Sequence, residues 1–112
     1  MLIGTAINCL FPGLAAAFAI YYWHRPAPPG VLDYWLIYCV VTVLSAIMMW
    51  WVPYFRGTNQ KTRDLYSKMY ARTLHVLPPR GDHPRPNVFH LLLHALGLVS
   101  LILAVVLRLG IA

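Results

Sequence analysis

Two histidines, His90 and His94, are the residues of this chain whose type and spacing could do chemistry. Four residues apart in a helix, they point the same way and lie roughly 6 Å apart along its axis. Both lie in an apolar run, where an imidazole can ligate haem iron or the magnesium of a chlorophyll-type pigment. A pigment needs one such side chain, whereas bis-histidine haem needs a second helix, and no other apolar run holds a histidine. His94 or His90 is therefore a candidate ligand of a pigment or a haem, and no separate metal site is predicted.

A structural role for the same two side chains is the interpretation that we favour. His90 lies within about one turn of the end of its run and His94 within about two. At that depth both can hydrogen-bond to Tyr, Ser or water. The chain has no paired carboxylates, no Ser-His-Asp or Cys-His set, no Gly-rich phosphate loop and no zinc spacing. The sequence therefore predicts a protein that is not an enzyme.

Three long apolar runs must position these histidines. Of the 112 residues 60% are hydrophobic and 11% charged, against roughly 25% charged in soluble domains. The runs cover about 2–22, 34–52 and 88–107, and each matches the roughly 20 residues that a helix needs to cross a bilayer. We predict an all-α membrane protein with three transmembrane helices in a single membrane domain over 1–112. A kink or a shallow hairpin at Pro12-Gly13 is left open for the first run, because Pro12 cannot donate a helical hydrogen bond.

The loop at 56–86 is basic, with seven Lys or Arg against Asp64 and Asp82, a net charge of +5. The positive-inside rule predicts that this loop and the N-terminus are cytoplasmic and that the C-terminus lies opposite. The expected location is the inner or intracytoplasmic membrane of a bacterium.

Within this loop, apolar residues at alternating steps of one and three predict a short amphipathic helix over about 60–77. Thr58 or Asn59 is its expected N-cap, and Pro78-Pro79 its end. A basic helix of this kind lies on anionic lipid headgroups or docks on a partner protein; no nucleic-acid partner is expected. The predicted membrane-surface residues are Lys61, Lys68 and Arg72 of this helix and Trp23, Trp50 and Trp51 at the ends of spans.

Small and polar residues recur at helical spacing on one face of each run. Lipid gives no reason to turn such groups outward, so we expect these faces to pack against other helices, in the same chain or in another subunit. The predicted packing residues are Thr5, Cys9, Gly13 and Ala17 in the first run, Tyr38, Thr42 and Ser45 in the second, and Gly97 and Ala104 in the third.

A few short sequence segments resemble the receptor-expression-enhancing proteins, a family of membrane-shaping hairpin proteins. Among them are Trp-Val-Pro-Tyr-Phe at 51–55 and Leu-Tyr-Ser-Lys-Met-Tyr at 65–70. That family has a second apolar hairpin at the place where this chain is polar and basic. The resemblance implies a membrane-shaping function, which we keep as an alternative.

The size, the few charges and the one-sided spans favour a small non-catalytic accessory subunit of a larger membrane complex, such as a photosynthetic or respiratory assembly. Its expected partners are membrane lipids and other membrane subunits. A pigment- or haem-ligating subunit is the second hypothesis.

Overall fold

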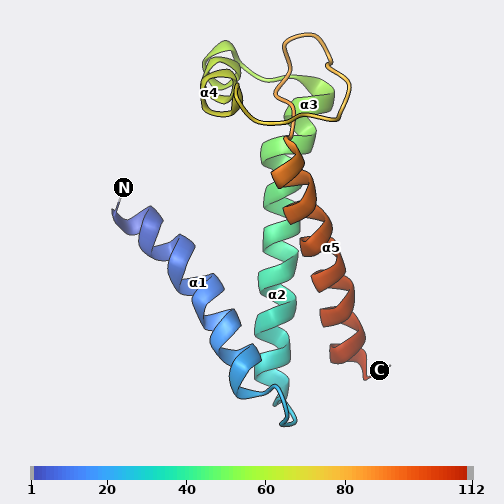
Figure 1. Cartoon of the computed structure of the whole chain (residues 1–112). Coiled ribbons are helices and arrows are strands. Elements are labelled where there is room, and N and C mark those ends of the chain that lie inside the picture. Colours follow the sequence, from blue (N-terminus) through green and yellow to red (C-terminus); the bar gives the residue numbers. More distant parts are fainter. Residues whose placement is uncertain (1, 111–112) are drawn as a thin grey trace. The chain divides into compact units, whose positions relative to one another are not determined.

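A computed structural model describes residues 2–110, which are helical throughout apart from turns and loops (Figure 1). Three helices are long and apolar enough to cross a membrane: α1 (Leu2–Tyr21), the helix over Pro29–Arg56, and α5 (Val88–Leu109). The middle one consists of α2 (Pro29–Ala46), a π-helical turn η1 (Ile47–Trp51) and α3 (Val52–Arg56). A short helix, α4 (Gln60–Tyr70), lies in the loop that follows. The predicted fold class is thereby confirmed.

The helices belong to two compact units, of which one comprises residues 2–41 and 100–110 and the other residues 42–99. The single membrane domain expected from the sequence stays a prediction.

In the first unit, α1 runs unbroken through Pro12. The hairpin alternative at Pro12-Gly13 is therefore wrong. Proline removes one donor, whereas ending the helix in lipid would leave many backbone groups unpaired. Two side chains at the start of α2 add hydrogen bonds to α1, since the Tyr34 hydroxyl donates to the Phe11 carbonyl at 2.7 Å and the Trp35 indole to the Ala15 carbonyl at 3.2 Å.

The middle span begins at Pro29, five residues before the predicted start. Proline suits the first helical position, because its fixed φ is helical and its missing N–H would be unpaired there anyway. The extra turn places Asp33 inside the helix, where its carboxylate pairs with Arg108 of α5. Arg108 thus has an ion-pair partner in the same unit.

The middle span also extends beyond its predicted end at residue 52 and includes Pro53. Pro53 has no N–H for the Met49 carbonyl four residues back. In the π-helical turn just before it, the Val52 N–H bonds to Ile47, five residues back. The Tyr66 hydroxyl of α4 donates to the Met49 carbonyl at 3.0 Å. The helix can therefore pass through a proline because α4 supplies the missing donor.

Tyr66→Phe is expected to weaken the packing of α4 on the span. It leaves the Met49 carbonyl unpaired, at a cost of about 1–3 kcal/mol in the free energy of unfolding. Partial burial, and to a lesser degree Tyr70, raises the pKa of Tyr66. The folded chain therefore holds the hydroxyl proton more tightly than the unfolded chain. The contribution of the protonated Tyr66 hydroxyl to the free energy of unfolding is therefore complete below the ordinary tyrosine pKa near 10. It is lost as the pH rises through the pKa that Tyr66 has in the folded chain.

Thermal unfolding in detergent at pH 7, combined with the rate of tryptic cleavage in α4, measures this loss. Tyr70→Phe is the matched control, because among the described residues the Tyr70 hydroxyl has no hydrogen-bond partner. Equal stability of the two variants would show that the bond to Met49 contributes nothing.

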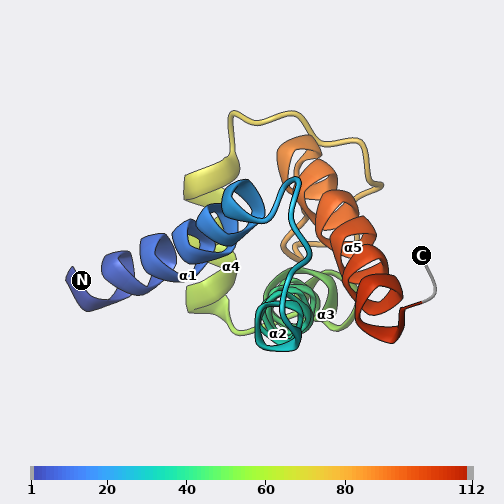
Figure 2. The same cartoon turned by 90° about the horizontal axis from the view of Figure 1, so that it is seen from below.

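α4 begins where the sequence predicts but ends earlier. The Asn59 side chain caps it by accepting from the Thr62 N–H at 2.8 Å. The helix stops at Tyr70, seven residues before the predicted end, because the Thr73 amide and hydroxyl both bond to the Tyr70 carbonyl. The Leu74 carbonyl then accepts from the Val88 N–H. Contacts to the start of α5 thus replace the last two helical turns with an extended loop (Figure 2).

The core of the second unit lies where this loop meets the ends of the spans. Trp50, Tyr54 and Asn87 are 7%, 4% and 3% exposed, and Pro86 is fully buried. Gly57 ends α3 with a φ of 82°, a backbone conformation that glycine adopts far more readily than other residues. A Cβ there would lie 2.9 Å from the His83 Nε2, so glycine also makes room for the loop.

Candidate functional site

The two predicted ligands lie in a cluster of aromatic rings centred on Trp50. The Trp50 ring lies 4.1 Å from the His90 ring, 4.9 Å from that of Tyr66 and 5.0 Å from that of Tyr70, centroid to centroid. The His90 and His94 centroids are 6.0 Å apart. Three segments supply these rings: η1 the tryptophan, α4 the tyrosines and α5 the histidines. The cluster joins the short helix to the spans.

Asn87 fixes the tautomer of His90. The Asn87 Oδ1 accepts from the His90 backbone N–H and lies 2.8 Å from the His90 Nδ1. A backbone N–H only donates, so this atom is the amide oxygen and the Nδ1 must carry a hydrogen. The Nε2 of neutral His90 is then left with the lone pair that a metal or haem ligand needs.

Trp51 fixes the opposite tautomer in His94. The Trp51 indole Nε1–H donates to the His94 Nδ1 at 3.1 Å. Because an indole N–H only donates, the Nδ1 has the lone pair and the Nε2 carries the hydrogen. His94 therefore lacks a lone pair on its outer nitrogen. The hydrogen bonds favour His90 over His94 as a ligand, and ligation by either stays a prediction.

The predicted membrane-surface residues lie in different environments. Trp50, expected at headgroup level, is buried under α4, because its large ring fills the space between the short helix and α5. Trp51 is half-buried and bonded to His94, whereas Trp23 is 76% exposed. The three basic side chains of α4 and the turn after it are exposed, as a surface role requires: Lys61, Lys68 and Arg72.

The predicted packing residues divide by span. Those of α1 are all exposed: Thr5, Cys9, Gly13 and Ala17. In the middle span Tyr38 is half-buried, while Thr42 and Ser45 are exposed. In α5, Ala104 is buried and Gly97 is half-buried, with the position of a Cβ 4.0 Å from Val43. What these faces pack against stays a prediction.

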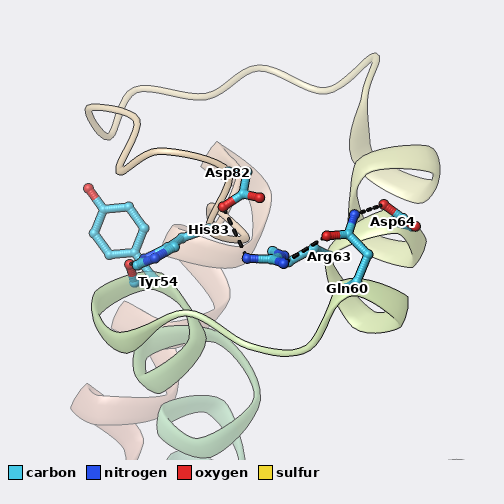
Figure 3. Close-up of polar contacts among 6 residues, drawn as sticks. All are labelled: Tyr54, Gln60, Arg63, Asp64, Asp82 and His83. Atoms are coloured by element: carbon cyan, nitrogen blue, oxygen red, sulfur yellow. Dashed lines mark hydrogen bonds and ion pairs between the residues drawn. The ribbon is translucent and has the colours of Figure 1, made fainter.

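A chain of polar side chains connects α4 with the loop that follows it (Figure 3). Arg63 pairs with the Asp82 carboxylate at 3.2 Å and donates to the Gln60 side-chain oxygen at 2.7 Å. Gln60 in turn donates to Asp64 at 2.7 Å. Among residues 2–110, the buried Nε of Arg63 has no hydrogen-bond partner. Both carboxylates of the basic loop are thus engaged, while one guanidinium N–H is left unpaired.

Beside this chain lies a pocket of about 360 Å³ between α4 and residues 79–85. Its charged groups are Arg63, Arg85, Asp64 and Asp82. A second pocket, of about 570 Å³ and largely apolar, lies between residues 42–51 and 91–98 and includes His94.

No family model, curated protein or solved structure matches this chain. The resemblance of short segments to the receptor-expression-enhancing proteins is thus not supported by a family match. Among residues 2–110, no group of three His, Cys, Asp or Glu side chains could hold a metal ion.

Several residues of the second unit have roles that the sequence does not predict. The Tyr54 hydroxyl donates to the Pro78 carbonyl at 2.6 Å, and the His83 Nδ1 donates to the Tyr54 carbonyl at 2.8 Å. These bonds join residues 24 and 29 positions apart, for which a single sequence carries no local signal. Asn87 is different, because an Asn directly before an apolar run is a recognisable N-cap.

Proposed function

We propose that the protein is a small non-catalytic accessory subunit of a larger membrane complex. The observation that supports this best is the exposed face of α1 that carries Thr5, Cys9, Gly13 and Ala17. In the part of the chain that the structure describes, no atom of another element lies within 4 Å of a Cβ placed on Gly13. Small residues let another helix approach closely, and close packing drives helix association in lipid. The partner on this face is a transmembrane helix of another subunit.

The hydrogen bonds of the histidines agree with a non-catalytic role. His90 and His94 position the ends of the spans through Asn87 and Trp51. The positive-inside rule puts the basic loop in the cytoplasm and the C-terminus opposite, in the inner or intracytoplasmic membrane of a bacterium. Photosynthetic and respiratory assemblies are the first hosts to test.

Gly13→Leu is expected to stabilise the isolated chain and to abolish its assembly. Leucine is favoured over glycine in a helix by about 0.5–1 kcal/mol, and the side chain meets open space in this chain. The same side chain would keep a partner helix away from α1. The measurement is native separation of gently extracted membranes, with identification of whatever co-migrates with the tagged protein.

Gly4→Leu is the matched control, because it makes the same change in the same helix, also into open space, but off the small-residue face. It should leave the complex intact. The proposal is wrong if the wild-type chain migrates alone, or if both variants keep their co-migrating partners.

A further inference from the structure

The apolar pocket of about 570 Å³ lies within the second unit, in the part of the chain that crosses the membrane. It is lined by residues of 42–51, from the end of α2 and from η1, and by residues of 91–98 of α5. Among the described residues, none of the lining side chains is charged. The volume lies within the range of small-molecule sites, about 300–1,000 Å³. A ligand of this pocket is therefore neutral and apolar over most of its surface.

Two donors without hydrogen-bond partners line this pocket. The His94 Nδ1 accepts from Trp51, which leaves the hydrogen on the Nε2 without an acceptor in the part of the chain that the structure describes. This Nε2 is accessible, in contrast to the enclosed Nε of Arg63. The Ser45 side chain is exposed and likewise has no hydrogen bond to any described residue. A donor in apolar surroundings is costly without an acceptor, so a ligand that carries acceptors is stabilised by both.

Both donors lie deeper than the ester groups of phospholipids, which lie at the ends of the spans. His94 is six residues from the start of α5 at Val88, about 9 Å of helix. Ser45 is eleven residues from the end of the middle span at Arg56, about 16 Å of helix and about half the thickness of a hydrocarbon core. At this depth a phospholipid offers only its acyl chains, which contain no acceptor. The acceptors must therefore belong to a molecule that dissolves in the hydrocarbon core.

We propose that this pocket binds a lipophilic quinone, a neutral planar ring with two carbonyl oxygens and a hydrocarbon tail. One carbonyl accepts from the His94 Nε2–H and the other from the Ser45 hydroxyl. The indole rings of Trp50 and Trp51 line the same pocket, and a planar ring can pack against them. The tail lies against the leucines of α5 that complete the lining: Leu91, Leu93 and Leu98.

A quinone suits this pocket better than other lipophilic molecules, because the pocket has two free donors and no charge. A hydrocarbon would leave both donors unpaired, and a molecule with a single carbonyl would leave one. A charged ligand would meet no counter-ion. His94 acts here as a donor and not as a metal ligand, in agreement with the tautomer that Trp51 imposes. The site uses no residue of the partner-binding face of α1, so it goes beyond the proposed accessory role and does not rest on it.

The test uses the full chain alone in phosphatidylcholine nanodiscs, with a decyl-substituted para-benzoquinone as the probe. Retention of the probe is compared with that in empty nanodiscs, and the infrared band of its isotope-labelled carbonyls is recorded. We expect saturable binding and a shift of the carbonyl band to lower frequency, because a hydrogen bond weakens the C=O bond. Decylbenzene has the same chain and a ring without carbonyls, and should be retained no better than in empty nanodiscs.

Two variants remove the donors one at a time. Ser45→Ala removes a hydroxyl without a partner in the chain, so the variant should stay folded and bind the quinone about three- to tenfold more weakly, the value of one hydrogen bond. Ser100→Ala makes the same change in α5 outside the pocket and should bind like the wild type. His94→Phe keeps a ring but has no Nε2–H, and should weaken binding by a similar factor and remove one shifted carbonyl band. Near-UV circular dichroism verifies that each variant is folded.

Four results would overturn the proposal. Equal retention of the quinone and decylbenzene shows that the pocket takes any apolar molecule. Equal affinities of the wild type, Ser45→Ala and folded His94→Phe show that neither donor binds a carbonyl. Weaker binding in His94→Phe alone makes a molecule with a single carbonyl the ligand. Retention no better than in empty nanodiscs shows that acyl chains fill the pocket. Because the chain is tested alone, none of these results depends on a partner at the face of α1.

Discussion

Replacing Trp50 with Ala is expected to detach α4 and the loop after it from the spans. Trp50 is 7% exposed and contacts Tyr66 and Tyr70 on one side and His90 on another. Truncation of a buried tryptophan to alanine costs about 3–5 kcal/mol through lost contacts and the cavity that remains. This is a large share of the 5–15 kcal/mol that stabilises a typical protein. The variant should lose the near-UV circular dichroism of the cluster while keeping its far-UV helix signal.

Trp23→Ala is the control for this change. It removes the same side chain from a position that is 76% exposed, so thermal unfolding in detergent should differ little from wild type. Limited trypsin digestion should cut Trp50→Ala rapidly in α4 and leave Trp23→Ala intact there. Slow digestion of both variants would contradict the central role of Trp50.

Asn87→Ala is expected to have the second largest effect, because one buried oxygen serves two donors. Asn87 is 3% exposed and accepts from both the backbone N–H and the Nδ1 of His90. Loss of an N-cap costs about 0.5–2 kcal/mol. A half-buried imidazole N–H left without its acceptor adds about 1–3 kcal/mol. We therefore expect a total loss of about 1.5–5 kcal/mol in the free energy of unfolding, measured by thermal or denaturant unfolding in detergent.

Asn87→Asp separates the cap from simple loss of volume. An aspartate keeps the oxygen that accepts from both donors, and Asp is as good an N-cap as Asn. It should retain most of the stability that Asn87→Ala loses. If Asp behaves like Ala at this position, the two hydrogen bonds to His90 are not what stabilises the start of α5.

Trp50 and Asn87 lie at the ends of the spans, where the basic loop begins and ends. The Tyr54 hydroxyl of α3 donates to Pro78 of the loop, the Tyr66 hydroxyl of α4 donates to Met49, and the Asn87 side chain at the end of the loop caps α5. These bonds bring the loop beside α4, where the pocket with Arg63 and Asp82 lies.

The sequence by itself determined the class of fold and the approximate position of every helix. Hydropathy is sufficient for this, because a span in lipid must be apolar along about 20 residues and must pair its own backbone groups as a helix. The expected N-cap at Thr58 or Asn59 and the spacing of the apolar residues after it likewise predicted the start of α4 correctly. These are local properties, and a single sequence carries them.

Tertiary structure alone decided where the helices end and what the polar residues do. α4 stops at Tyr70 because the following loop bonds to the start of α5, and the middle span passes Pro53 because Tyr66 supplies a donor from α4. His90 and His94, equivalent by spacing, differ in tautomer because one faces an amide oxygen and the other an indole N–H. Each of these outcomes depends on a group far away in the chain, which periodicity and composition cannot report.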